Sequence, residues 1–494
     1  MEKRAGILLP VFSLPSKYGI GTLGKDAFEF VDFLKKTNQK YWQVLPLGQT
    51  SYGDSPYQSP SVYAGNPYFI DLDLLHKEGL LTKTELKASE REVGEIDYGW
   101  LWETRYILFE KAFKRFQKKP QTQFETFKKA NAFWLDDYSL FMAVKQKNNF
   151  VSMLLWSEDD RNYDLQIKKK NDIIQREPKH GHLIEFYSFL QFYFFKQWFE
   201  LKSYANDNGI KIIGDRPIYS SHDSHEVWGM PKYFQVNDDL SLQAVAGCPP
   251  DAFSDDGQLW GNPLYNWEYL KERNFDFWLK SLEFNLTMFD ILRIDHFRGF
   301  VAYWSIPADH ATARYGQWIE APFYDLFTLI KEKFDSSRII AEDLGVIDQP
   351  VVDAMNFCGY PGMKILQFAF GGGSDNIHLP HNFSENTILY TGTHDSKTTK
   401  EWLDTESEDE IFRAFQYMQK REDESGVGTF IRGAMTSHAN IAIIPMQDYL
   451  EVGGIGRINL PSTLGTNWKW RLQANYINDN LINYVKTLTD YRPK

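Results

Sequence analysis

The sequence contains very little cysteine. Cys248 and Cys358 are the only two among 494 residues, so no framework of disulfide bonds can hold the chain together. This composition is typical of proteins from reducing compartments. Near the N-terminus a short apolar run, residues 6–9, is interrupted by Pro10, and no small-residue cleavage site follows it. We therefore expect no signal peptide and a cytoplasmic location.

An excess of basic residues and a long apolar run are also missing. The chain has 54 Lys and Arg against 66 Asp and Glu, and its net charge of −12 opposes binding to nucleic acid or to an anionic membrane surface. The most aromatic stretch, residues 186–199, is broken by Gln191 and Lys196 and is too polar to span a bilayer. Neither nucleic acid nor a membrane is an expected partner.

Familiar motifs for phosphate groups and metal ions are not found either. Residues 371–373 are three glycines, but Ser and Asp follow them instead of the Lys-Ser/Thr pair of a phosphate loop. His222, His225 and Glu226 lack the spacing of a zinc motif, and residues 251–257 lack the closing Glu of a calcium loop. We predict no metal and no cofactor.

Aromatic residues, in contrast, are abundant. The 15 Trp, 27 Tyr and 37 Phe make up 16% of the chain, and most of them are expected to fill the core. Sugar rings have apolar faces that stack on aromatic side chains, so aromatic residues on loops are suited to bind a polysaccharide.

Eight short runs rich in β-branched residues predict strands, and helical patterns lie between most of them. Strands that alternate with helices imply a parallel sheet, and eight such strands indicate an α/β fold of the (β/α)₈ TIM-barrel type. The predicted strands are 6–9, 41–45, 211–214, 291–294, 338–341, 364–368, 387–390 and 441–445.

Two intervals are too long for simple strand–helix units. Residues 48–185 hold helical patterns around 98–118, 124–130 and 134–148, and residues 216–274 are rich in Pro, Gly and Asp. We interpret residues 1–494 as a single catalytic barrel with inserted subdomains, a mainly helical one at 48–185 and a loop-rich one at 216–274. Both are expected on the side of the barrel where loops shape the active site.

Carboxylates follow three of the predicted strands. Asp295 and Glu342 come directly after apolar runs, and Asp395 follows the strand that ends at Tyr390. The ends of barrel strands converge on one face, so we expect these acids to lie together. A structural alternative is that they cap loops and helices, which one acid can easily do but three at strand ends do less readily.

This pattern suits the cleavage of a glycosidic bond with retention of configuration. That reaction needs a carboxylate nucleophile and, about 5 Å away, a carboxylic acid whose pKa is raised so that it stays protonated. Arg293 lies two residues before Asp295 on the same predicted strand, so both side chains point to the same side. Its permanent charge is expected to favour the ionised form of Asp295.

Several segments resemble the motifs of 4-α-glucanotransferases, also called amylomaltases or disproportionating enzymes, a family of the α-amylase clan. The matches run from about residue 6 to about residue 471, and together they are highly specific. They are Arg293-Ile-Asp-His-Phe-Arg-Gly, Ala341-Glu-Asp-Leu-Gly, Gly392-Thr-His-Asp, Gly214-Asp-Arg-Pro-Ile, Tyr52-Gly-Asp-Ser-Pro-Tyr-Gln-Ser-Pro with Ala64-Gly-Asn-Pro, and Pro249-Pro-Asp with Trp260-Gly-Asn-Pro-Leu-Tyr.

The resemblance implies a role for each matching residue. Asp295 corresponds to the nucleophile, Glu342 to the general acid and base, and Asp395 to a third carboxylate that holds sugar hydroxyls and helps keep Glu342 protonated. The remaining matches correspond to substrate-binding groups: Asp215, Arg293 and His394 hold the sugar at the cleavage point, Tyr57 lies beneath it, and Trp260 is a candidate for stacking on the acceptor side. For Trp260, plain packing within its loop is the alternative.

Three positions depart from the family pattern. Ser396 follows Asp395 where Asn is expected, Ala252 stands where an aromatic residue is common, and Cys248 stands where an apolar residue is usual. The first is expected to alter a hydrogen bond behind Asp395, and the second removes a contact from the active-site loop.

The predicted function is therefore the transfer of a segment of an α-1,4-glucan to the 4-hydroxyl of another glucan or of glucose. Malto-oligosaccharides are the expected donors and acceptors. One alternative is an α-1,4-glucan hydrolase of the same clan, which shares the first half of the reaction. Another is a non-catalytic glucan-binding barrel, which would not need all three carboxylates.

Overall fold

All eight predicted strands are present, and they form one parallel sheet. The computed structural model describes residues 3–176, 178–250 and 254–492. The strands follow one another in the order β10-β11-β12-β1-β2-β3-β6-β9. Between the two end strands, the backbone N–H of Ala341 donates to the carbonyl of Pro361 at 3.1 Å and so joins the ends of the sheet. The strands are β1 Arg4–Leu8, β2 Tyr41–Gln43, β3 Lys211–Arg216, β6 Ile291–Ile294, β9 Ile339–Ala341, β10 Gly362–Ile365, β11 Thr387–Tyr390 and β12 Ile441–Pro445.

The predicted (β/α)₈ barrel is thereby confirmed, with small differences at strand ends. The strand predicted at 364–368 begins earlier, at Gly362, and stops at Ile365 because Leu366–Phe368 form a 3₁₀ turn. The inward-facing side chains are mostly β-branched and almost fully buried, so they fill the barrel interior as side-chain layers. This cluster contains Leu8, Tyr41, Ile213, Ile291, Ile340, Met363, Ile365, Ile388, Tyr390, Ile441 and Ile443.

A second, antiparallel sheet lies beside the barrel and was not predicted. Its strand order is β5-β4-β7-β8, and it combines strands from the segments before and after β6. The segment 216–274, interpreted from its composition as loop-rich, supplies two of these strands. The four strands are β4 Ala244–Cys248, β5 Gln258–Pro263, β7 Ala302–Pro307 and β8 Gln317–Glu320.

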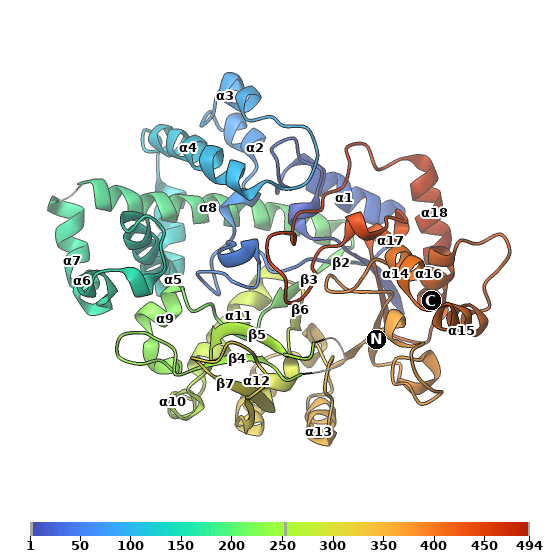
Figure 1. Cartoon of the computed structure of the whole chain (residues 1–494). Helices are drawn as coiled ribbons and strands as arrows, with labels where there is room; N and C mark the ends of the chain where they lie inside the picture. The colour runs from blue at the N-terminus through green and yellow to red at the C-terminus, as the bar shows by residue number, and fades with distance from the viewer. Residues whose placement is uncertain (1–2, 177, 251–253, 493–494) are drawn as a thin grey trace.

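Helices lie around the outside of the barrel, and helices also make up most of residues 48–185. In Figure 1, α2–α7 gather on one side of the molecule and α14–α18 on the other, with the barrel strands between them. The helices are α1 Lys25–Lys36, α2 Leu72–Lys77, α3 Lys83–Ala88, α4 Tyr98–Phe116, α5 Thr122–Lys147, α6 Glu158–Arg161, α7 Tyr163–Arg176, α8 Pro178–Asp207, α9 His225–Gly229, α10 Trp267–Glu272, α11 Asp276–Met288, α12 Phe323–Lys333, α13 Gln349–Cys358, α14 Thr399–Thr405, α15 Glu408–Met418, α16 Gly426–Thr436, α17 Met446–Tyr449 and α18 Asp479–Asp490.

The helical patterns around 124–130 and 134–148 both belong to one continuous helix, α5. Asn131 is a weak helix former, but its side-chain amide donates to the carbonyl of Phe127 one turn earlier at 2.9 Å. Trp134 follows it, fully buried, so packing supports the helix where local propensity is low. None of the helices within the described ranges is long and apolar enough to cross a membrane.

Gly6 marks a point where two barrel strands come unusually close. A Cβ atom at this position would lie 2.5 Å from Cβ of Tyr41 and 2.7 Å from its carbonyl oxygen. Since part of this obstacle is backbone, the strands themselves would have to separate. Gly6→Ala is expected to destabilise the fold by about 1–3 kcal/mol, the usual cost of overpacking a core.

The measurement is the thermal unfolding midpoint, with Gly94→Ala as the matched control. A Cβ atom on Gly94 would have no heavy atom within 4 Å, so this variant should unfold like the wild type. Equal midpoints for both variants would show that β1 and β2 can move apart without cost.

Candidate active site

The carboxyl ends of the barrel strands bring the predicted acids to one rim. Asp215 lies within β3 and pairs in register with Arg293 on β6. Asp295 directly follows β6, and Glu342 directly follows the neighbouring strand β9. The backbone N–H of Glu342 donates to the carbonyl of Ile294, so the two strand ends are bonded side by side. The parallel sheet thus places three acids from distant segments next to one another.

Arg293 stands at the centre of this group. Its Nη1 lies 2.6 Å from Oδ1 of Asp215 and 2.9 Å from Oδ1 of Asp295, and its side chain is only 4% exposed. Asp215 is completely buried, so its charge is balanced within the protein rather than by water. Sequence reasoning predicted that Arg293 faces Asp295, and the structure shows this ion pair.

Glu342 is held by backbone groups. Its Oε2 accepts the N–H of His296 at 2.7 Å, and its Oε1 accepts the N–H of Leu344 at 2.9 Å. His296 presents its N–H from a left-handed conformation with φ 48°. Burial raises the pKa of Glu342 to about 7, with the negative charge of Asp295 adding to the effect against the opposing charge of Arg293. This carboxyl therefore takes up a proton far more readily than an exposed Glu.

Asp295 has the same kind of environment but a closer cation. Burial raises its pKa to about 6, although Arg293 acts in the opposite direction. Its side chain keeps 25% of its surface exposed, which leaves the carboxylate open to a ligand. The two neighbouring acids thus differ in their partners, a guanidinium for Asp295 and backbone N–H groups for Glu342, in the way that the predicted roles need.

Asp395 belongs to a chain of polar contacts that crosses the rim. Oδ2 of Asp395 lies 3.1 Å from Nε2 of His394, which lies 2.9 Å from the hydroxyl of Tyr57. That hydroxyl donates to Oδ2 of Asp215 at 2.7 Å. Burial would raise the pKa of Asp395, but His394 and an amide donor, Asn459, together lower it to about 2. Asp395 therefore remains ionised.

The loop that carries Tyr57 is fixed from outside the barrel. Oε1 of Glu226 accepts the N–H of Val62 at 2.7 Å, and the N–H of His225 donates to the carbonyl of Pro60 at 3.0 Å. Both acceptor and donor lie at the start of α9 and are buried. The ring of Tyr57 stacks on that of His394 with centroids 5.5 Å apart. The polar cluster at 222–226, whose spacing does not fit a zinc motif, thus holds the loop that carries Tyr57.

Trp260 lies on β5, close to the acids. Its ring meets the ring of His296 edge-on, with centroids 4.8 Å apart. The side chain is half-buried, and Nε1 donates to the side chain of Gln258 at 3.1 Å. Trp260 therefore lines the side of the site next to Asp295, and part of its surface remains accessible.

The departures from the family pattern have different consequences. Oγ of Ser396 accepts the N–H of Thr393 at 3.0 Å and so closes the turn that presents His394 and Asp395. Cys248 is the last residue of β4, and its side chain is half-buried. Ala252 lies outside the described residues.

Two contributors to the site were missed by sequence reasoning. The amide of Asn459 donates to Oδ1 of Asp395 at 2.6 Å, and its backbone N–H donates to the carbonyl of His394 at 3.1 Å. Trp468 packs near both Tyr57 and His394, with centroid distances of 5.8 and 6.2 Å. Both residues lie in an irregular segment without a motif, and only the aromatic side chain of Trp468 hinted at sugar contact.

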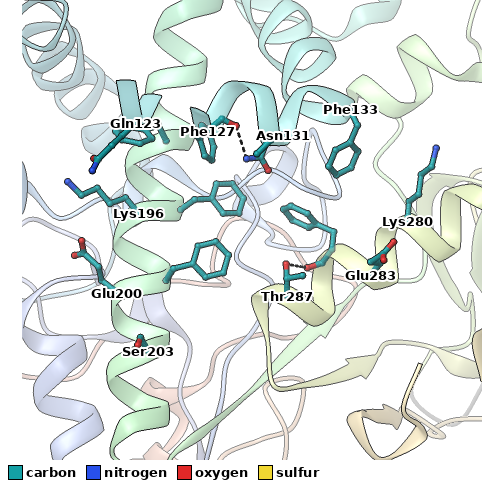
Figure 2. Close-up of a pocket in the computed structure, with 15 residues that line it drawn as sticks. Gln123, Phe127, Asn131, Phe133, Lys196, Glu200, Ser203, Lys280, Glu283 and Thr287 are labelled. Atoms are coloured by element: carbon teal, nitrogen blue, oxygen red, sulfur yellow. Dashed lines mark hydrogen bonds between the residues drawn. The ribbon is translucent and has the colours of Figure 1, made fainter. Parts of the chain in front are cut away.

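A roomy groove of about 940 Å³ lies elsewhere, between α5, α8 and α11. Phenylalanine rings line it, with Lys196, Glu200, Lys280 and Glu283 at its edges (Figure 2). None of the predicted site residues borders this groove, so it is separate from the acids at the rim. Among the described residues, no group of three or more His, Cys, Asp and Glu side chains is arranged to hold a metal ion.

A (β/α)₈ barrel that places a cation-paired Asp beside a buried Glu of raised pKa at its strand ends has the arrangement used by enzymes that act on glycosidic bonds. Comparison with known proteins gives the family. Residues 9–477 match the sequence profile of the 4-alpha-glucanotransferases. A 4-alpha-glucanotransferase from Clostridium butyricum is 48% identical over 485 residues, which cover 97% of this chain and 98% of that protein. The chain belongs to the 4-alpha-glucanotransferase family.

Other relatives agree. A 4-alpha-glucanotransferase from Streptococcus pneumoniae is 43% identical over 97% of this chain and 95% of its own length. The solved structure of an amylomaltase from Streptococcus agalactiae, in complex with acarbose, superposes with a TM-score of 0.95 at 41% identity and covers 100% of both chains. Fold and size are therefore shared over the whole length.

The contact between Asp395 and His394 leads to a prediction about titration. Burial alone would lower the pKa of His394, but the charge and hydrogen bond of Asp395 raise it above its usual value. Asp395→Asn removes the charge, so the pKa of His394 is expected to fall. The measurement is the pH dependence of histidine ring nitrogen shifts by NMR.

His378 serves as the internal control, since burial, together with the charge of Lys364, lowers its pKa to about 4 without any contribution from Asp395. A His394 titration that is the same in Asp395→Asn and wild type would show that the two side chains do not form an ion pair in solution.

Proposed function

We propose that Asp295 and Glu342 perform a retaining double displacement in which this 4-alpha-glucanotransferase moves a glucan segment between chains. Ionised Asp295 attacks the anomeric carbon of the bound sugar, while Glu342 gives its proton to the departing glycosidic oxygen. A covalent glucosyl ester on Asp295 results. Glu342, now a carboxylate, takes the proton of the incoming 4-hydroxyl, and that oxygen displaces Asp295.

The observation that carries this assignment is the unequal environment of the two acids. Glu342 is buried, its hydrogen bonds among the described residues come from backbone N–H groups, and its pKa is raised to about 7, whereas Asp295 is paired with Arg293 at 2.9 Å. A general acid must hold a proton near neutral pH, and a nucleophile must have lost one. The structure therefore supports Glu342 as the acid and Asp295 as the nucleophile.

The remaining predicted residues are proposed to bind the sugar at the cleavage point. Asp395 stays ionised beside His394, so it can accept hydrogen bonds from sugar hydroxyls, and its negative charge also acts on Asp295. Asp215, Arg293 and Tyr57 form the rest of the hydrogen-bonded wall. Because these groups bond one another already, the wall is ordered before a sugar arrives.

The acceptor is proposed to approach past Trp260. This ring borders His296, the residue that follows Asp295 and donates to Glu342. A glucose ring stacked there would bring its 4-hydroxyl toward Glu342, and it would displace water from the covalent intermediate. Malto-oligosaccharides and longer α-1,4-glucans are the proposed donors and acceptors, in keeping with the acarbose bound by the Streptococcus agalactiae amylomaltase.

Two further proposals concern organisation and location. Residues 48–185 and 216–274 are proposed to be insertions into one catalytic barrel, since they supply α2–α7 and two strands of the second sheet and contribute Tyr57 and Trp260 to the rim. A cytoplasmic location is proposed because the sequence has only two cysteines, too few for a framework of disulfide bonds.

Incubation with maltotriose tests the reaction. Transfer should give glucose and longer oligosaccharides while the total number of reducing ends stays constant, because each bond broken is replaced by another. Asp295→Asn should fold normally and lose turnover by at least about a thousandfold, the order of loss seen when a nucleophile is removed. The measurements are chromatography of the products and a reducing-end assay.

Rising reducing ends would mean hydrolysis instead, and no turnover by the wild type would mean a binding protein. Near-normal activity in Asp295→Asn would exclude this residue as the nucleophile, provided that its circular dichroism and unfolding midpoint match the wild type.

The pKa values of the two acids predict a bell-shaped dependence of kcat/KM on pH. Activity should fall as the pH drops through about 6, because Asp295 becomes protonated, and as the pH rises through about 7, because Glu342 loses its proton. Measurement of initial rates on maltotriose across this range checks both limbs. A rate that stays constant well above the pKa of Glu342 would contradict its role as the acid.

A further inference from the structure

Arg293 has a second contact that the proposed reaction does not use. Its Nε donates to the sulfur of Met363 at 3.4 Å, while Nη1 serves both Asp215 and Asp295. Sulfur is a weak hydrogen-bond acceptor. Because the guanidinium of Arg293 is buried, however, its N–H groups must find partners within the protein in place of water. The group is thus held at two different nitrogens, so that both its position and the tilt of its plane are defined.

Contacts with Asp343 fix the position of Met363. It lies on β10, where the barrel closes against β9 with no paired residues between the two strands. Its backbone N–H donates to Oδ1 of Asp343 at 2.6 Å, and the next residue, Lys364, pairs with Oδ2 of the same carboxylate at 3.0 Å. Asp343 therefore adds to the backbone hydrogen bond from Ala341 to Pro361 and helps to fix the position of Met363 in the barrel.

Gly362 makes this approach possible. A Cβ atom on Gly362 would lie 2.6 Å from Oδ2 of Asp343. Asp343 directly follows Glu342, so one segment carries the proposed acid and also anchors the strand that supports Arg293. The side chain of Met363 is 1% exposed and belongs to the apolar cluster inside the barrel. Its sulfur contacts the guanidinium of Arg293 from the interior of the barrel.

We propose that Met363 is a positioning residue that holds Arg293 in register with Asp215 and Asp295 through its sulfur atom. The inference rests on the proposed roles of Asp295 and Glu342. Met363 acts on both acids through the guanidinium. Its contribution is the acceptor atom, because an apolar side chain of the same volume would fill the space but leave Nε without a partner.

The direction of the effect follows from the charge of Arg293. The guanidinium lowers the pKa of both Asp295 and Glu342 against the effect of burial. If it moves more freely, this lowering weakens and both pKa values rise. The two limbs of the pH–rate profile should then move together toward higher pH, which a general loss of stability would not cause.

The test compares Met363→Leu with Met363→Gln in the full-length protein. Leu keeps the volume and removes the acceptor, whereas Gln keeps the chain length and offers a carbonyl oxygen. With maltotriose as substrate, Met363→Leu is expected to lower kcat about tenfold and to shift both limbs of the profile to higher pH. Met363→Gln is expected to restore the wild-type profile and most of kcat.

Met435→Leu is the matched control. Met435 is fully buried in α16, away from the strand ends, and should show how much the exchange of Met for Leu costs in packing alone. An unshifted profile in Met363→Leu, or a Gln variant no better than the Leu variant, would overturn the inference. Asp295→Asn assayed alongside separates the two levels: if it is active, the proposed reaction fails; if it is inactive while the Met363→Leu profile is unshifted, only the inference about Met363 fails.

Discussion

The ion pairs of Arg293 with Asp215 and Asp295 are the interaction on which the rest of the site depends. Four acids, Asp215, Asp295, Glu342 and Asp395, gather at one rim of the barrel, and the charges of Asp215 and Asp395 each raise the pKa of Asp295. Arg293 is a permanent cation placed between them, with Nη1 in contact with two of the four. Arg293 is the direct counter-charge of Asp215 among the described residues, and without it the pKa values of Asp295 and Glu342 would rise further.

This arrangement also explains why the site needs the whole barrel. Asp215 and Arg293 belong to neighbouring strands, and their register is set by the β3–β6 ladder. Tyr57 reaches Asp215 from the N-terminal part of the chain, and Asn459 reaches Asp395 from the C-terminal part. Each of these contacts joins residues far apart in the sequence, so a shift of one strand would change several hydrogen bonds together. The relative positions of the side chains at the rim therefore depend on strand pairing and on the packed interior of the barrel.

Much of this could be predicted because local sequence and tertiary position coincide at strand ends. Runs such as 291–294 and 387–390 are rich in β-branched residues and buried on both faces, and the carboxyl ends of parallel barrel strands lie at one face. The antiparallel sheet was harder to predict because Gly lies within β4 and β5, and because β4 pairs with β7 across the whole of β6 and its flanking helices. The role of Asn459 could not be predicted from the sequence, because it is recognised only from the contact with Asp395 in the folded protein.

The different roles proposed for Asp295, Glu342 and Asp395 depend on the cation that each carboxylate contacts. Asp395 contacts His394 and Asn459, and its pKa is the lowest, at about 2. Asp295 contacts Arg293, which also serves Asp215, and its pKa of about 6 is intermediate. Within the described chain, no Lys, Arg or His side chain forms a direct ion pair with Glu342, which has backbone N–H donors and the highest pKa of the three, about 7. Backbone donors stabilise a carboxylate less than a full positive charge does, so the acid with only such donors is the one that can still carry a proton. The placement of two cations by the barrel therefore adds to the ordinary difference between Asp and Glu: Asp295 and Asp395 each contact a cation directly, and Glu342 contacts backbone N–H groups.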